Sequence, residues 1–223
     1  MSGGAERVLA ALVAGHGRTF AEEAGIRLRD TPQPLYRTLV MACLLGARIR
    51  GSVALATTRA LYDAGLRDPR RMARASWQER VDVLGRGGYR RYDERTATQL
   101  GDGAGLLLER WGGDPRRMRE AADGDTDELR RLLRELPGLG PAGVDIFLRE
   151  VQRVWPEVGP RLDAKALEGA ARLGLPEEPG RLLELAGDTE PAVLAAALVR
   201  AALDRTVLDD CLRRADGTRS GTA

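Results

Sequence analysis

The segment between Leu132 and Val151 constrains the fold more than any other part of the sequence. Apolar residues precede position 136 and follow position 143 at helical spacing, and the residues between them are LPGLGPAG. Such spacing gives each flanking helix one apolar face. Two glycines surround Leu139, and glycine adopts the positive φ values that tight turns need. The sequence therefore predicts two amphipathic helices packed face to face across a short hairpin.

Composition favours helices along the whole chain. Leu, Ala, Arg and Glu dominate, whereas aromatic residues make up 4%, and the dominant residues are strong helix formers. Glycine and proline interrupt the helical pattern at intervals, and no pair of strands is evident. We therefore expect an all-α fold.

Local signals place several helix boundaries. Asp68, before Pro69, and Ser76 have the side chains expected of helix N-caps. The two prolines within residues 30–34 indicate a linker, with a domain boundary at position 32. The C-terminal residues 214–223 are small and polar, and we expect them to be a disordered tail.

The few cysteines and histidines exclude several cofactor classes. The chain has two cysteines, Cys43 and Cys211, and one histidine, His16, whereas thiolate metal sites need clustered ligands. We therefore expect no cofactor and no iron–sulfur cluster. Nothing in the sequence suggests a disulfide framework or a membrane span, so we expect a cytoplasmic protein.

The hairpin has the chemistry of an anion site. The second helix begins next to Gly140, and the first amides of a helix have no partner within the helix. Together with the helix dipole, these amides favour an anion such as a nucleic-acid phosphate. The alternative is an ordinary helix–helix turn with a glycine C-cap and a proline at the first helical position. The residues predicted to bind DNA here are Leu136, Gly138, Leu139, Gly140, Ala142 and Gly143.

The hairpin and the residues after it resemble a known family. LRELPGLGPAGVDIFL is followed by VWPEVGPRLDAKALEGAARLGLP. Together they are similar to the helix-hairpin-helix, Gly/Pro loop and aspartate of the endonuclease III-like DNA glycosylase superfamily. The Gly/Pro loop corresponds to residues 159–162, and the family's catalytic aspartate falls on Asp163. The resemblance extends over residues 34–176, about two-thirds of the chain.

The resemblance implies both a domain organisation and a chemistry. It implies a six-helix barrel-like domain over residues 32–154 and a second helical domain made of residues 1–31 and 155–213. Damaged DNA would bind in the cleft between these domains. A base would be flipped out of the stack and its N-glycosidic bond cut, as in base excision repair.

Two departures from the family matter. Members that also cleave the strand carry a lysine nucleophile near the start of the second hairpin helix, and here that position falls on Ala142. Many members carry a four-cysteine iron–sulfur loop near the C-terminus, where this chain has Cys211 alone. The resemblance therefore implies a monofunctional glycosylase without the lyase step and without the cluster.

Two residues are candidates for catalysis. Asp163 would stabilise the positive charge that develops on the sugar and polarise an attacking water; alternatively, it only caps the following helix. Lys165, the only lysine in the chain, would supply a substitute amine or a phosphate contact; alternatively, it is a solvated surface residue.

Further candidates would contact DNA outside the hairpin. Arg48 falls where related proteins fill the gap left by the flipped base. Tyr89 and Arg90 belong to a basic, aromatic elbow suited to phosphates and stacking. The alternative for each is an ordinary surface residue in an arginine-rich chain.

Three hypotheses therefore remain from the sequence. The first is a DNA glycosylase that acts on double-stranded DNA containing a damaged base or abasic site, as a nucleoid-associated monomer. This first hypothesis includes a monovalent cation bound by the carbonyl oxygens of Leu136 and Leu139. The second is a catalytically inactive module that recognises damaged or bent DNA. The third is a scaffold whose hairpin packs against protein.

Overall fold

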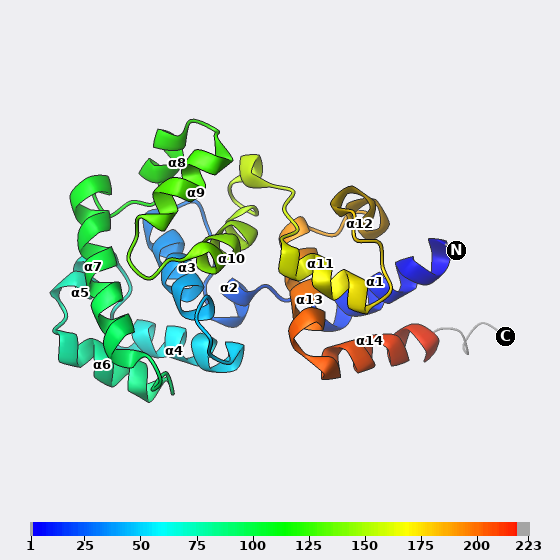
Figure 1. Cartoon of the computed structure of the whole chain (residues 1–223), viewed down its shortest axis with the longest axis horizontal. Helices are drawn as coiled ribbons and strands as arrows, with labels where there is room; N and C mark the ends of the chain where they lie inside the picture. The colour runs from blue at the N-terminus through cyan, green and yellow to red at the C-terminus, as the bar shows by residue number, and fades with distance from the viewer. Residues whose placement is uncertain (1, 218–223) are drawn as a thin grey trace. The chain divides into compact units, whose positions relative to one another are not determined.

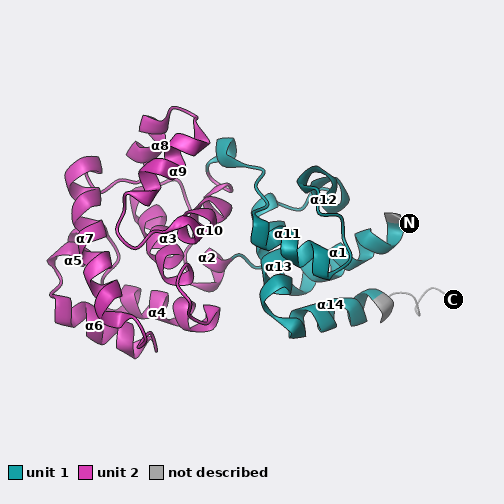
Figure 2. Cartoon of the chain, in the orientation of Figure 1, with its two compact units in different colours: residues 1–19, 155–223 teal, residues 20–154 magenta. Residues whose placement is uncertain are grey.

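The computed structural model describes residues 2–217, and within this range the chain forms helices and no strand (Figure 1). The all-α prediction is confirmed. Two compact units are present (Figure 2). Unit 1 combines the two ends of the chain, residues 1–19 and 155–223, and unit 2 comprises residues 20–154. None of the described helices is both long enough and apolar enough to cross a membrane.

Unit 2 is formed by the central part of the chain. Helix α10 packs on α3, α3 packs on α4, and α7 packs on both α5 and α6. The helices of this unit are α2 (Phe20–Glu23), α3 (Pro32–Leu45), α4 (Gly51–Asp63), α5 (Pro69–Arg74), α6 (Trp77–Arg86), α7 (Asp93–Trp111), α8 (Arg116–Ala122), α9 (Thr126–Arg134) and α10 (Pro141–Val151).

The core of unit 2 lies where these helices meet. Helix α3 buries residues on nearly all of its faces, including Leu35, Met41 and Leu44, because α4 and α10 both pack on it. From α10, Phe147 and Leu148 are fully buried. Burying a leucine or phenylalanine side chain contributes about 1.5–3 kcal/mol. This core therefore anchors the second helix of the hairpin to α3.

Unit 1 is built around α13, a helix rich in alanine. Small side chains let neighbouring helices approach closely, and both α1 and α11 pack on α13. Gly169 of α11 lies directly against the backbone of Leu198 in α13, which leaves no room for a side chain. The elements of this unit are α1 (Ser2–His16), the 3-10 turn Pro156–Val158, α11 (Ala164–Arg172), α12 (Pro179–Ala186), α13 (Pro191–Leu203) and α14 (Arg205–Gly217).

Two boundaries differ from those predicted. Helix α3 begins at Pro32, so both prolines of the predicted linker lie in its first turn, where a helix tolerates proline because those amides have no helical partner. Residues 20–31, which the sequence placed with the other domain, group with unit 2. Side chains of unit 2 hold them there: Arg37 donates to the carbonyl oxygen of Gly25 and Arg59 to that of Glu23.

The predicted disordered tail is wrong over its first residues. Helix α14 continues to Gly217, and the Arg214 Nε donates to Asp210 Oδ2 at 2.7 Å, one turn earlier. Ala215 is buried. These contacts extend the helix past position 213, and the remainder of the predicted tail, 218–223, lies outside the described residues.

Candidate nucleic-acid interface and catalytic carboxylate

The predicted hairpin connects α9 to α10. Asp125 caps α9 by accepting hydrogen bonds from the amides of Asp127 and Glu128. Leu139 is 4% exposed, and its amide donates to the carbonyl oxygen of Leu136 at 3.0 Å. The buried Leu136 and Leu139 therefore hold the turn from inside, and any DNA contact of theirs is limited to backbone atoms.

The two glycines of the hairpin have different structural roles. Gly138 has φ +86°, and a Cβ built on it would lie 2.8 Å from the Cys43 Sγ. Both facts require glycine there. Gly140 has φ −73° and ψ −179°, which any residue adopts, and a Cβ there would meet nothing within 4 Å. The fold therefore requires glycine at position 138, whereas at position 140 glycine is one of several residues favoured as an N-cap.

The start of α10 is open to solvent. Gly140 is the N-cap, and no side chain caps the helix. The first bond of the helix runs from the Val144 amide to the Gly140 carbonyl oxygen. Pro141 has no N–H, and Gly143, a predicted DNA contact, is buried with its amide nitrogen against Gly46. The donors that remain are the amides of the exposed residues Gly140 and Ala142, which have no helical acceptor. The first turn holds no acidic residue, and Pro141 and Ala142 are exposed. This end of the helix therefore favours an anion by its dipole and by its free donors.

The predicted loop residue Arg48 lies close to the hairpin. A Cβ on Gly46, at the end of α3, would lie 3.0 Å from the amide nitrogen of Gly143. Arg48 follows Gly46 by two residues, so its Cα is within about 7.6 Å of the Gly46 Cα. Arg48 is exposed. The structure thus brings this arginine and the start of α10 into one neighbourhood.

The elbow between α6 and α7 is only partly as predicted. Arg90 is exposed, but Tyr89 is 1% exposed, so the prediction that its ring stacks on DNA is wrong. Burial raises the pKa of Tyr89 to about 12, against a hydrogen bond with Thr96 that lowers it. Gly87 packs directly against Thr57 of α4, so the elbow lies close to that helix.

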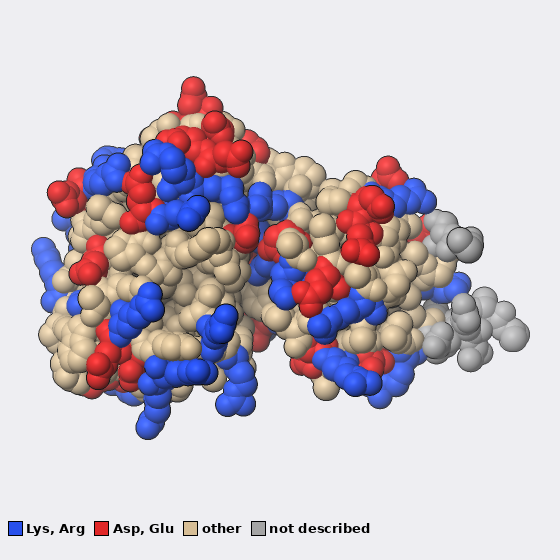
Figure 3. Space-filling model, in the orientation of Figure 1, with Lys and Arg blue, Asp and Glu red and all other residues tan. Residues whose placement is uncertain are grey.

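Exposed arginines lie on the loop after α3 and on the elbow between α6 and α7, and together they form what we call the arginine surface of unit 2. Both segments adjoin α4. Gly87 of the elbow contacts the middle of this helix, and Arg50, at the end of the loop after α3, directly precedes its first residue. Basic side chains gather over α4 and the end of α6 in Figure 3. Among the described residues, six exposed guanidinium groups in this region form no ion pair or hydrogen bond: Arg48, Arg50, Arg86, Arg90, Arg91 and Arg95.

The candidate catalytic carboxylate is held at the start of α11. Asp163 is the N-cap, and its Oδ1 accepts from the Ala166 amide at 3.0 Å. It is 8% exposed. The capping role that the sequence offered as an alternative is therefore present. Capping fixes the carboxylate in place, and it is compatible with a catalytic role because a carboxylate has several acceptor positions.

The second catalytic candidate has a structural partner. Lys165 lies on the exposed face of α11 and forms an ion pair with Glu168, which also pairs with Arg172 at 3.0 Å. These bonds from Lys165, and then from Arg172, hold the pKa of Glu168 below its usual value. Lys165 belongs to unit 1 with Asp163, whereas the hairpin and the arginine surface belong to unit 2.

The monovalent-cation site predicted at the carbonyl oxygens of Leu136 and Leu139 stays a prediction. The carbonyl oxygen of Leu136 accepts the Leu139 amide, which uses part of its acceptor capacity. Within residues 2–217 no cluster of three or more histidine, cysteine, aspartate or glutamate side chains is arranged to hold a metal ion.

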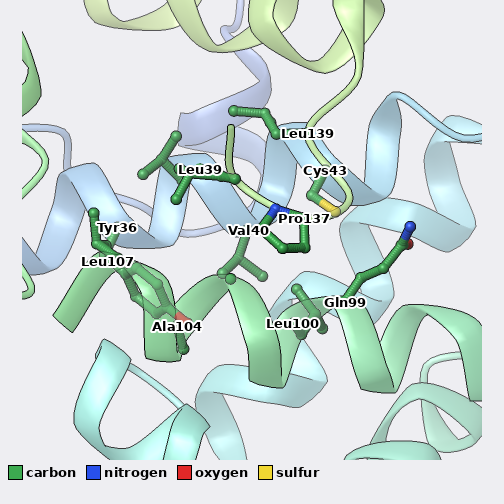
Figure 4. A pocket seen from close by; sticks show the side chains of 12 residues that line it. Tyr36, Leu39, Val40, Cys43, Gln99, Leu100, Ala104, Leu107, Pro137 and Leu139 are labelled. Atoms are coloured by element: carbon green, nitrogen blue, oxygen red, sulfur yellow. The ribbon is translucent and has the colours of Figure 1, made fainter. Parts of the chain in front are cut away.

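The sequence did not predict the residues of α3 and α7 that pack against the hairpin. Cys43 of α3 and Gln99 of α7 both contact Gly138, and with Pro137 they line a small, mainly apolar cavity of about 40 Å³ (Figure 4). No local signal marks them, because the pairs are separated by 95 and 39 positions in the chain. Gly103 of α7 also lies against the hairpin, since a Cβ on it would stand 3.3 Å from the Pro137 carbonyl oxygen, but α7 contains two other glycines that the sequence does not distinguish from it.

Comparison with known proteins gives no further guide. No family model matches the chain, and no curated protein matches its sequence.

Proposed function

We propose that this protein is a monofunctional DNA glycosylase that binds double-stranded DNA through unit 2 and releases a damaged base. The observation that carries the DNA-binding part is Gly140. It is an exposed glycine at the start of a helix, and neither its φ nor its surroundings require glycine. A glycine at such a place lets an external backbone approach the free amides closely. A DNA phosphate has the charge and size for that position.

The arginine surface supports the same partner. Six exposed arginines without a carboxylate partner outnumber Asp93 and Glu94 of the same segment and favour a positive potential here, although the whole chain has a formal net charge of only +2. A nucleic acid is a regular polyanion, and neutralising its phosphates releases counterions. The affinity for DNA is therefore expected to fall as salt increases.

Asp163 supports the catalytic part of the proposal. In hydrolysis, water attacks C1′ of the flipped nucleoside while the C–N bond to the base breaks and the base leaves with the electron pair. Positive charge grows on the sugar, and a fixed carboxylate stabilises it and accepts the proton of the water. The proposal assigns both tasks to Asp163, whose orientation the Ala166 amide fixes.

DNA binding is tested with Gly140→Ala, with Gly180→Ala as the matched control. Gly180 also stands near the start of a helix, and a Cβ on it meets nothing within 4 Å. Gly180→Ala should unfold within about 0.5 kcal/mol of the wild type. Gly140→Ala should lose up to about 1 kcal/mol, because glycine is favoured over alanine at an N-cap, so affinities are measured well below the unfolding temperature. Gly140→Ala should weaken binding to an abasic-site duplex about tenfold, which is about 1.4 kcal/mol. Equal affinity of the two variants would contradict the role of the hairpin.

Catalysis is tested with Asp163→Asn, because asparagine retains the cap and keeps the helix stable. The variant should fold normally and release no base from lesion duplexes that the wild type cleaves. Borohydride should trap no covalent complex with the wild type. A trapped complex that disappears in Lys165→Ala would show instead that this single lysine acts as the nucleophile.

A binding module without catalysis is the second candidate. The observations that favour it are Ala142 at the position where the resembling family has its lysine, and the engagement of both Asp163 and Lys165 in local structural contacts. Salt-dependent affinity for lesion DNA without base release from a broad panel of lesions would select this function over the glycosylase.

A further inference from the structure

The peptide between Gly138 and Leu139 is held at both ends. The Cys43 thiol donates to the Gly138 carbonyl oxygen at 3.2 Å, and the Leu139 amide donates to the Leu136 carbonyl oxygen at 3.0 Å. The carbonyl and amide groups of a trans peptide are rigidly coplanar and point in opposite directions. Two bonds on opposite sides therefore fix the orientation of this peptide, which lies one peptide unit before Gly140.

The Cys43 contact is sterically tight as well as polar. A Cβ on Gly138 would meet the Cys43 Sγ at 2.8 Å and the Gln99 Cβ at 3.1 Å. Gln99 lies on α7 and Cys43 on α3, so two helices that are distant in sequence both contact Gly138. Figure 4 shows Cys43 beside the hairpin and Gln99 on α7.

Cys43 has the right chemistry for a permanent donor. Burial raises the pKa of its thiol to about 12, so the group keeps its proton at any physiological pH. A deprotonated sulfur would lose the bond, because a thiolate has no proton to donate. The thiol also borders the small, mainly apolar pocket lined by Leu39, Val40 and Leu100.

We propose that Cys43 is a positioning residue that sets the hairpin for DNA binding. Its hydrogen bond fixes the Gly138 carbonyl toward the interior, and the chain then leads to the exposed residues Gly140 and Ala142, whose amides are the free donors at the start of α10. This inference rests on the proposed DNA-binding function of the hairpin. Cys43 itself is expected to make no contact with DNA.

The test compares three variants, and the chain offers a close control. Cys211, on α14, also donates its thiol to a backbone carbonyl oxygen at 3.2 Å, that of Val8 in unit 1. Cys43→Ala and Cys211→Ala each remove one such bond, while Cys43→Ser keeps a donor in place. The affinity for an abasic-site duplex is measured well below the unfolding temperature. Exchange of the Leu139 amide with solvent deuterium is measured on the same proteins without DNA.

Cys43→Ala should bind the duplex about fivefold more weakly than the wild type, which is about 1 kcal/mol. Its Leu139 amide should exchange faster. Cys43→Ser and Cys211→Ala should match the wild type in both measurements. A Cys43→Ala protein with unchanged affinity and unchanged exchange would overturn the inference, as would an equal loss of affinity in Cys211→Ala.

The two measurements separate this inference from the proposed function. If the wild type has no salt-dependent affinity for DNA, the proposed function fails. The exchange of the Leu139 amide then still decides whether the Cys43 hydrogen bond holds the hairpin in its conformation. Faster exchange in Cys43→Ala supports this role, and unchanged exchange refutes it.

Discussion

The backbones of Gly46 and Gly143 lie in direct contact. A Cβ on Gly46 would stand 3.0 Å from the Gly143 amide nitrogen and 3.1 Å from its Cα. In the other direction, a Cβ on Gly143 would stand 3.3 Å from the carbonyl oxygen of Ala42 in α3. The end of α3 and the start of α10 can approach this closely because neither glycine has a side chain. The contact fixes the loop that carries Arg48 beside the hairpin.

Gly46→Ala should therefore destabilise unit 2 and displace that loop. Gly46 has φ −71°, so the backbone accepts alanine and only packing opposes it. Overpacking of this kind costs about 1–3 kcal/mol, to be measured by urea unfolding. Gly51→Ala is the control, because its nearest neighbour would be an ordinary contact at 3.9 Å. Similar stabilities of the two variants would show that the helices separate without cost.

Arg80→Lys should destabilise unit 2 more strongly. The Arg80 guanidinium is buried and donates to three carbonyl oxygens, at 2.7 Å to Ala97, 3.1 Å to Met72 and 2.6 Å to Ala75. Lysine lacks the planar fork that reaches several acceptors at once, and each buried carbonyl left without a donor costs about 1–3 kcal/mol. Thermal unfolding is compared with Arg74→Lys, at an exposed arginine on α5. A loss in Arg80→Lys no larger than in this control would contradict the argument.

Helix caps were predictable because they depend on neighbouring residues alone. The side chains of Asp68 and Ser76 accept from the amides of Arg71 and Glu79, as the sequence predicted. The start of α3 was misplaced, since a proline signals equally a linker or a first helical turn. Local patterns thus located most elements and erred where one residue type suits two structures.

The candidate site was less predictable because tertiary contacts decide it. Exposed and buried tyrosines look the same in sequence, and only the structure shows that Tyr89 is buried. The bond between Cys43 and Gly138 joins residues 95 positions apart, for which a single sequence carries no signal. Asp163, by contrast, was recognisable as a cap from its position after a Gly/Pro loop.

Gly105→Ala should stabilise the protein, whereas Gly101→Ala should destabilise it. Both glycines lie inside α7, where glycine costs about 0.5–1 kcal/mol relative to alanine. A Cβ on Gly105 meets nothing within 4 Å, but one on Gly101 would lie 2.5 Å from the Arg80 Nη2. Unfolding in urea measures both. A stabilised Gly101→Ala would mean that the Arg80 side chain shifts without losing its carbonyl partners.

Asp210 should contribute to acid sensitivity in unit 1. Its Oδ2 lies 3.0 Å from the His16 Nε2 of α1 and 2.7 Å from the Arg214 Nε. The hydrogen bond from His16, and then the one from Arg214, hold the pKa of Asp210 below its ordinary value of 3.8. The folded state therefore favours the ionised carboxylate, and this stabilisation is present above the unfolded pKa and lost as the pH falls through the lower, folded pKa.

Asp210→Asn should accordingly be less stable than the wild type above about pH 4, and the difference should shrink as the pH falls toward 2. Unfolding free energies across this range test it. Asp209→Asn is the matched control, because Asp209 is exposed and forms no ion pair among the described residues. Some acid sensitivity should remain in Asp210→Asn, since Glu168 and Asp204 of the same unit also have lowered pKa values. A constant difference between Asp210→Asn and the wild type at every pH would mean that the carboxylate acts through its shape and hydrogen bonds, and that its charge contributes nothing.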